Sequence, residues 1–189
     1  SLYGADAVGG VIQVFTRRPD APFTPEFGLG YGSYDTYKGY AGISGRGDAT
    51  WYSVRVSHEE TDGINACRGD ANLFAGCFTW EPDHDGYRNQ TVSLRGGVRF
   101  GRAWEAEATA LRAEGRTDYD GSFTNEVDSV QQAVGATLRY GTGEAMAWTF
   151  SAGQSLDEAD DFLNGVLMTR FDTRRDQAAV QGDFVIGQG

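Results

Sequence analysis

Two short acidic motifs with the same spacing carry the clearest chemistry in the sequence. Asp83 and Asp85 stand in DHDG, and Asp118 and Asp120 stand in DYDG. In each motif one residue separates the two aspartates, and a glycine follows that permits a tight bend with both carboxylates turned inward. Calcium takes about six to eight oxygen ligands from carboxylates and carbonyls. The motifs favour a calcium site; the alternative is that they belong to solvated acidic loops.

The first motif lies in a long polar segment, Thr61–Arg88, which also holds the chain's two cysteines, Cys67 and Cys77. Two cysteines in one loop, without the CxxC spacing of a metal site, favour a local disulfide formed in an oxidising compartment. Two unpaired thiols in a cytosolic loop are the alternative. Because long loops on a regular scaffold often carry function, we expect this segment to do so.

Three aromatic side chains flank the first acidic motif: Phe78, Trp80 and Tyr87. They could contact the apolar face of a bound ligand. They could equally bury the base of the loop, and the sequence does not separate the two roles. They are the candidate substrate-binding residues of the chain.

Composition excludes some partners and favours an all-β fold. The formal net charge is −11, which excludes a nucleic-acid partner because phosphate binding needs a basic surface. Glycine is abundant, with 27 residues against 4 prolines, and 13% of residues are aromatic, as is typical of all-β proteins. The mean hydropathy is −0.45, which fits a soluble protein or a membrane β-barrel, whose strands face water with every second residue.

Eight runs of alternating apolar and polar residues predict eight β-strands. Most are joined by turns rich in glycine and aspartate, and a linker at residues 20–25 precedes the first one. The predicted strands are Glu26–Tyr34, Thr36–Ser44, Thr50–Glu60, Asn89–Phe100, Trp104–Arg116, Asp128–Tyr140, Met146–Gly153 and Thr169–Ile186.

The two faces of these strands differ. On one face, small residues such as Ala106, Ala108 and Ala110 lie mid-strand, and aromatic residues lie towards the strand ends. Aromatic girdles around an apolar band are typical of outer-membrane barrels, whereas a β-sandwich would bury the same residues in a core. The predicted girdle residues are Trp51, Tyr52, Phe100, Trp104, Tyr140 and Trp148.

The other face carries arginines and two glutamates, Glu105 and Glu107. In a wide barrel these groups would pair with one another or with a domain inside the barrel. No nucleophile with an adjacent base, zinc motif or phosphate loop accompanies them, so we expect no enzymatic activity. The arginines are Arg55, Arg95, Arg99 and Arg139.

The lengths of the connections support a membrane barrel. From the third connection onward, long polar segments alternate with short turns; the long ones are Thr61–Arg88, Thr117–Val127 and Ser155–Leu167. Antiparallel strands that cross a membrane place all long loops on one side. A Greek-key sandwich has no reason to keep this alternation.

The first twenty residues resemble the end of the plug domain of TonB-dependent outer-membrane receptors. In that family a Leu-Tyr-Gly, a small or acidic pair and a Gly-Gly precede the last plug strand. Leu2-Tyr3-Gly4, Ala5-Asp6, Gly9-Gly10 and Val11–Thr16 match in order. The resemblance implies that residues 1–20 end a plug domain and that residues 21–189 begin a 22-stranded transmembrane β-barrel.

Within the family, the loop residues resemble the cobalamin-transporter branch, where aspartates of the early extracellular loops bind calcium. The matching metal ligands are Asp83, Asp85, Tyr119, Asp120 and Asp128. The resemblance implies energy-coupled uptake of a corrinoid through the bacterial outer membrane, with membrane lipid and the TonB energy-coupling complex as partners. A siderophore or other metal-chelate receptor, a small structural or adhesive eight-stranded barrel, and a calcium-binding β-sandwich lectin are the alternatives.

Overall fold

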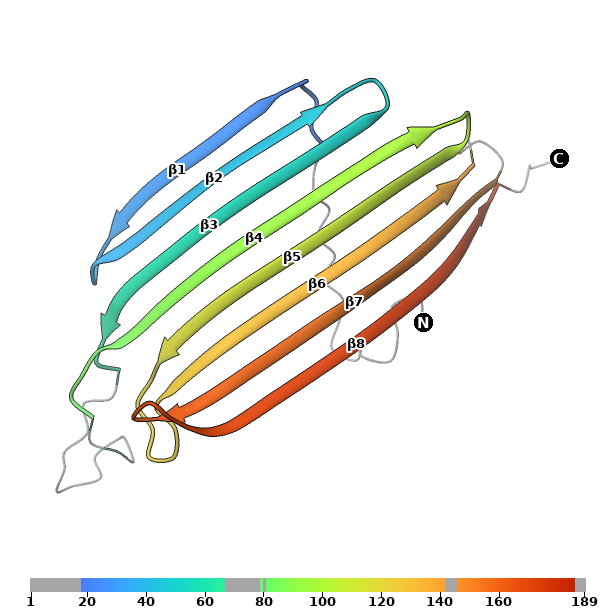
Figure 1. Ribbon diagram of the computed structural model, residues 1–189. Coiled ribbons are helices and arrows are strands. Elements are labelled where there is room, and N and C mark those ends of the chain that lie inside the picture. The colour runs from blue at the N-terminus through green and yellow to red at the C-terminus, as the bar shows by residue number, and fades with distance from the viewer. Residues whose placement is uncertain (1–17, 67–78, 80, 142–145, 186–189) are drawn as a thin grey trace.

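The chain forms one antiparallel β-sheet. The computed structural model describes residues 18–66, 79, 81–141 and 146–185. Eight long strands lie side by side in the order of the sequence (Figure 1). The strands are β1 (Thr24–Gly32), β2 (Thr36–Arg46), β3 (Thr50–Ile64), β4 (Asp85–Phe100), β5 (Trp104–Asp118), β6 (Glu126–Tyr140), β7 (Met146–Leu163) and β8 (Val166–Phe184).

Each strand pairs antiparallel with the next, and within the described residues β1 and β8 pair with no further strand. The predicted all-β fold is therefore confirmed, and it is consistent with a segment of a larger barrel. A sandwich is excluded for this part of the chain because its residues form a single sheet. The sheet is also open, so it is not a closed eight-stranded barrel.

The sheet has almost no core of its own. Trp51, with 3% of its surface exposed, is the one buried hydrophobic residue in the described part of the chain. Large apolar side chains stand in the open instead, such as Leu29 at 91% and Phe27 at 82% exposure. No helix in the described ranges is long and apolar enough to cross a membrane. Large apolar side chains with this exposure call for contacts that lie outside the described residues.

One face, here called the apolar face, carries a continuous hydrophobic band. The register aligns Leu94, Ala110 and Val134 across β4, β5 and β6, with Phe100, Trp104 and Tyr140 in a second row nearer the short turns. Phe100 stacks on Trp104, and Trp104 contacts Tyr140 at 4.7 Å between ring centroids. These rows confirm an aromatic girdle at one edge of an apolar band, although Trp51 is not part of it, as shown below.

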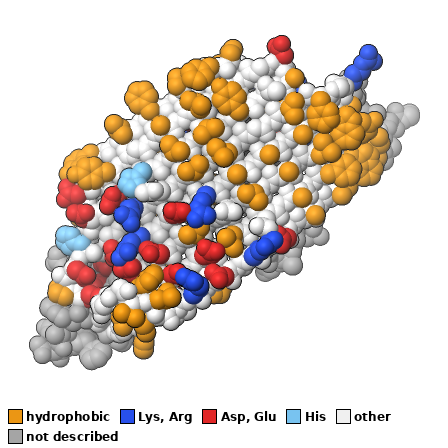
Figure 2. Space-filling model, in the orientation of Figure 1, with side chains coloured by type: hydrophobic (Ala, Val, Ile, Leu, Met, Phe, Trp, Pro, Cys, Tyr) orange, Lys and Arg blue, Asp and Glu red, His pale blue; other side chains and the backbone are white. Residues whose placement is uncertain are grey.

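The apolar face changes character towards the long loops. Beyond Ala110, the same face of β5 carries Arg112, Glu114, Arg116 and Asp118. Figure 2 shows charged side chains gathered near the loop end and hydrophobic ones over the rest of this face. A barrel strand crosses the apolar layer in about 9–11 residues, so strands of 15 to 19 residues extend well beyond it.

The strand ends explain one wrong prediction. Ser155–Leu167 does not form a long loop, because β7 continues to Leu163 and only Asn164 and Gly165 connect it to β8. Both turn residues have positive φ, 52° and 76°, as a two-residue hairpin turn requires. The acidic residues Asp157–Asp161 are paired strand residues of β7.

At the same end, β3, β4, β5 and β6 are longer than predicted, whereas β1 ends at Gly32, two residues before the predicted Tyr34. β3 extends from the predicted Glu60 to Ile64, β4 begins at Asp85, and β5 and β6 each gain two residues beside residues 119–125. The predicted insertion Thr61–Arg88 therefore shrinks to the connection between Ile64 and Asp85, of which residues 65–66, 79 and 81–84 are described. That loop and residues 119–125 are the two longest connections, and they lie at the same end of the sheet (Figure 1).

Candidate functional site

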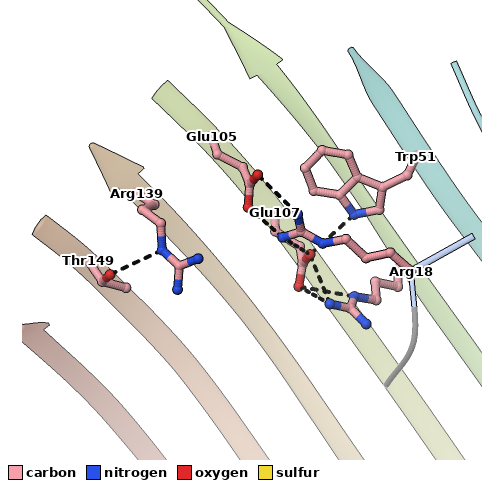
Figure 3. Close-up of polar contacts among 7 residues, drawn as sticks. Arg18, Trp51, Glu105, Glu107, Arg139 and Thr149 are labelled. Carbon is pink, nitrogen blue, oxygen red and sulfur yellow. Dashed lines mark hydrogen bonds and ion pairs between the residues drawn. The ribbon is translucent and has the colours of Figure 1, made fainter. Parts of the chain in front are cut away.

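The most closely connected polar side chains lie on the polar face, where the segment before β1 contacts the sheet. Arg18 donates two hydrogen bonds to Glu105 on β5, from Nη2 to Oε1 at 2.5 Å and from Nη1 to Oε2 at 3.1 Å. Its Nη2 also lies 3.5 Å from Glu107 Oε2. Figure 3 shows Arg18 reaching both glutamates. The segment that precedes β1 is thus attached to a strand in the middle of the sheet.

Trp51 forms the wall of this site. Its neighbour Tyr52 lies on the apolar face, so strand alternation turns Trp51 to the polar face. The Arg18 guanidinium carbon lies 4.3 Å from the centre of the Trp51 ring, and Trp51 Nε1 donates to Glu107 Oε2 at 3.2 Å. The prediction that Trp51 belongs to the membrane girdle is therefore wrong. Its indole is buried beneath a cation instead.

Glu107 connects Trp51 to a second arginine. Arg95 on β4 donates from Nε and Nη2 to the two carboxylate oxygens of Glu107, both at 3.0 Å. Their side chains are 22% and 18% exposed, so water screens the pair only partly. We call Arg18, Trp51, Arg95, Glu105 and Glu107 the inner joint. The predicted pairing of polar-face arginines and glutamates with one another is confirmed here.

Further arginines surround the inner joint. Arg99 and Arg139 lie directly opposite Glu105 on the two neighbouring strands. Arg139 Nε donates weakly to Thr149 Oγ1 at 3.4 Å (Figure 3). Elsewhere on the polar face, Arg55 pairs with Glu26 at 3.1 Å. The polar face is therefore lined by charged and hydrogen-bonding groups, as the inside of a wide barrel requires.

The predicted metal ligands lie at the opposite end of the sheet. Asp83 is exposed in the loop before β4. Asp85 is the first residue of β4, and its Oδ2 accepts a hydrogen bond from the Ala66 amide at 2.6 Å, which closes the base of the loop. Tyr119 and Asp120 lie in residues 119–125. Tyr119 closes that loop through its amide, which donates to Asn125 O at 2.9 Å.

Asp128 lies on β6, and it is 4.0 Å from Arg116 on β5. Arg116 also pairs with Glu126 and, at 3.6 Å, with Asp118. Three carboxylates therefore share one guanidinium. In the described part of the chain, no three His, Cys, Asp or Glu side chains gather closely enough to hold a metal ion. The structure brings the predicted ligands to one end of the sheet without assembling them into one cluster.

A polar cavity opens at this end, lined in part by Asp62, His84, Tyr87, Arg88 and Arg116. Tyr87 is the one predicted substrate-binding residue that the structure describes, and it is 37% exposed. The cavity carries charges of both signs. It lies beside the bases of the two longest loops.

A hydrogen-bond network that the sequence does not reveal ties three connections together. Glu81 accepts hydrogen bonds from Asn125 Nδ2 and from the Gly121 amide, and its carbonyl accepts from Asn65 Nδ2 at 3.4 Å. Asn125 Oδ1 in turn accepts from the Asn164 amide at 2.9 Å. We call Asn65, Glu81, Asn125 and Asn164 the loop-end network. Single polar residues in loops have no periodicity, so no sequence pattern singles them out.

Several sequence-based predictions fall outside the described residues. These are the plug motif in residues 1–16, the disulfide between Cys67 and Cys77, and the binding residues Phe78 and Trp80. They stay predictions.

Comparison with known proteins supports the resemblance seen in the sequence. No protein-family model matches the chain. The chain is 25% identical over 193 residues to the vitamin B12 transporter BtuB of Photobacterium profundum. The aligned region covers 100% of this chain and 30% of that protein. The likeness is to a transporter, and the single antiparallel sheet fits a barrel segment of such a protein.

Proposed function

We propose that the chain forms part of the wall of a TonB-dependent receptor in a bacterial outer membrane. The receptor would import a scarce ligand, most specifically a corrinoid, and would catalyse no reaction. The observation that carries this proposal is the two-faced sheet: one face bears an apolar band with an aromatic girdle, and the other holds Arg18 in a paired polar cluster. Lipid would cover the first face and a plug domain the second.

The similarity to a vitamin B12 transporter supports the choice of a corrinoid. The resemblance of residues 1–20 to the end of a plug domain supports energy coupling, in which the TonB complex of the inner membrane would act on the plug. A siderophore or another metal chelate is the second candidate ligand. The mixed charges of the cavity beside His84 and Arg88 suit a polar chelate as well as a corrinoid.

Calcium would order the loop end, with Asp83, Asp85, Tyr119, Asp120 and Asp128 as the proposed ligands. The donors at this end fit calcium chemically, because they are carboxylate, amide and carbonyl oxygens. Asn65 Oδ1 adds an observation of its own: it is buried and accepts no hydrogen bond from the described residues. Such an acceptor is costly to bury without a donor or a cation. Calcium would bring together loops that the loop-end network already connects.

Calorimetry on the intact receptor tests both the ligand and the ion. Cyanocobalamin is titrated with calcium present and again with a chelator in excess. We expect binding with calcium and a loss of at least about tenfold in affinity with chelator, which is about 1.4 kcal/mol. Absence of binding under both conditions would reject the corrinoid, and a ferric siderophore then becomes the ligand to test.

A pair of variants separates the ion from a general effect of charge. Asp85→Asn should lower the affinity for calcium, because a carboxylate ligand is replaced by a weaker amide oxygen. Asp48→Asn is the matched control, since Asp48 is an exposed aspartate in the turn at residues 47–49, at the far end of the sheet. Equal calcium affinity in the two variants would remove Asp85 from the site.

A further inference from the structure

We propose that Trp51 is a positioning residue. It makes the polar face of β3–β5 a preformed binding site for the guanidinium of Arg18, which we call the seat. This site selects arginine over lysine at position 18. The inference deepens the proposed function, because Arg18 belongs to the segment assigned to the end of the plug, and it rests on that function for this meaning. The seat itself follows from contacts among described residues.

The orientation of the Trp51 ring is fixed by the sheet beneath it. Trp51 pairs with Gly97 on β4, and a Cβ added to Gly97 would lie 2.1 Å from Trp51 Cζ2. The indole therefore lies against the backbone of β4, in space that only glycine leaves free. Its Nε1 donates to Glu107 at 3.2 Å, which fixes the rotation of the ring. Trp51 is consequently held from two sides by groups other than Arg18.

Glu107 is also held without Arg18. Both of its oxygens accept hydrogen bonds from Arg95 on the neighbouring strand. Trp51, Glu107 and Arg95 thus form a connected unit on β3, β4 and β5, three strands that pair in register. A site whose walls are fixed before the guanidinium arrives loses little freedom on binding it, and such preorganisation strengthens binding.

The geometry of Arg18 uses features that lysine lacks. A guanidinium is flat and carries several N–H donors in one plane, so it can stack on an aromatic ring and still donate two parallel bonds to a carboxylate. Arg18 does both: its Cζ lies 4.3 Å from the Trp51 ring centre, and two of its nitrogens reach Glu105 (Figure 3). An ammonium group could make the ion pair, but it has no flat face to stack and no fixed fork.

The seat determines where the preceding segment is anchored. β1 pairs only with β2 among the described strands, whereas Arg18 bonds to β5. The segment that carries Arg18 is therefore attached to the sheet at β5, several strands away from β1, where the chain enters the sheet. A preformed seat at this point would hold the end of the plug while other parts of the plug change position.

The test is a double-mutant cycle in the intact receptor, read by hydrogen exchange of the Arg46 amide, which donates to the carbonyl oxygen of Ala21 at 2.9 Å and so reports whether the segment that carries Arg18 stays on the sheet. Trp51→Leu should raise exchange there about tenfold, because the stacking surface is lost. Trp51→Phe should keep most of the protection, since it retains a ring and loses only the Nε1 donor. Arg18→Lys should raise exchange similarly, and Trp51→Leu should add little on that background, because the pair acts as one unit.

Trp104→Leu is the matched control, because Trp104 has the same chemistry on the apolar face. It should leave exchange of the Arg46 amide unchanged. Additive effects of Trp51→Leu and Arg18→Lys would overturn the proposal. So would a Trp51→Leu variant in which the amides of β3, β4 and β5 lose as much protection as the Arg46 amide, since that would show a general structural role. Hydrogen exchange is measured without the transported ligand, so the proposal can fail while the proposed function stands.

Discussion

The inner joint and the loop-end network perform comparable tasks by different physical means. Each ties together parts of the chain that are distant in sequence: Arg18 with β5 in the first, and the connections around Asn65, Asn125 and Asn164 in the second. Four of the five residues of the inner joint stand on paired strands, Arg18 being the exception, and its charged groups surround one buried indole. The loop-end network stands on loops and uses a single carboxylate with amide groups.

Because one region lies mainly on strands and the other on loops, the two should respond differently to substitution. Strand residues have a backbone fixed by hydrogen bonds on both sides, so a bulky or unpaired group in the inner joint has nowhere to move. Loop residues can rearrange and find water as a substitute partner. We therefore expect substitutions in the inner joint to cost more than equivalent ones in the loop-end network.

The largest effect should come from Gly97→Ala. The added Cβ would lie 2.1 Å from Trp51 Cζ2 and 2.9 Å from the Ala106 carbonyl oxygen, so the indole must leave its place on β4. We expect a loss of about 2–3 kcal/mol in the free energy of unfolding, as for overpacking in a core. Thermal and urea unfolding of the intact protein measure it.

The control for this variant is the neighbouring glycine. Gly96 lies on the apolar face, where an added Cβ would meet only the Trp51 carbonyl oxygen, at 3.6 Å. Gly96→Ala should therefore leave stability within about 0.5 kcal/mol of the parent protein, as for most surface changes. Equal losses in the two variants would show that Trp51 does not depend on the space above Gly97.

Glu107→Gln should have the next largest effect. It replaces the carboxylate that accepts from both Arg95 and Trp51 by a neutral amide, which weakens a charge-assisted contact to an arginine that is only 22% exposed. We expect a loss of about 1–2 kcal/mol in the free energy of unfolding. Glu114→Gln is the matched change in an exposed pair, Arg112–Glu114, and should cost less than about 0.5 kcal/mol. A ranking in the reverse order would contradict the strength assigned to the inner joint.

A smaller effect is expected in the loop-end network. Glu81→Gln replaces one carboxylate oxygen that accepts from Asn125 or Gly121 by an amide that donates. The cost should be about 1 kcal/mol and should be local. Hydrogen exchange should rise at residues 119–125 and stay unchanged in β4 and β5. Phe123→Ala, at a side chain that is 85% exposed, provides a control for that loop and should change neither region.

The sequence predicted the strands where their two faces differ. Alternation identified all eight strands, and it placed Glu105, Glu107 and Arg95 on the face where they pair. The alternation pattern gave the wrong face at one position, where two aromatic residues are adjacent. Trp51 and Tyr52 both suit a membrane girdle by residue type, and only the paired Gly97 shows that the first of them has room on the polar face.

The same reasoning failed where both faces of a strand are polar. Asp157, Glu158, Asp160 and Asp161 place acidic side chains on both faces of the strand with only Ala159 between them, so their segment resembled a loop. In the structure, β8 supplies the missing partner, because Arg170 pairs with Asp160 across the two strands. That pairing depends on register, which composition does not encode. The loop-end network was missed for a related reason, since its contacts join residues far apart in sequence.

This pair between β7 and β8 also yields the smallest and most specific prediction. Arg170 donates to both oxygens of Asp160, at 2.5 and 2.6 Å, and holds the pKa of that carboxyl below its usual range. A carboxyl with a lowered pKa in the folded state contributes stability above its unfolded pKa of about 3.9. The contribution is then lost as the pH falls through the folded pKa.

Asp160→Asn should therefore lower the melting temperature of the intact protein slightly at pH 7, and the difference from the parent protein should shrink as the pH approaches about 3. The effect should be smaller than that of Glu107→Gln, because Arg170 is 59% exposed and salt screens the pair. Melting temperatures of both proteins across this pH range, at low and high salt, provide the measurement. A difference that grows on acidification would show that Asp160 gains no stabilisation from Arg170.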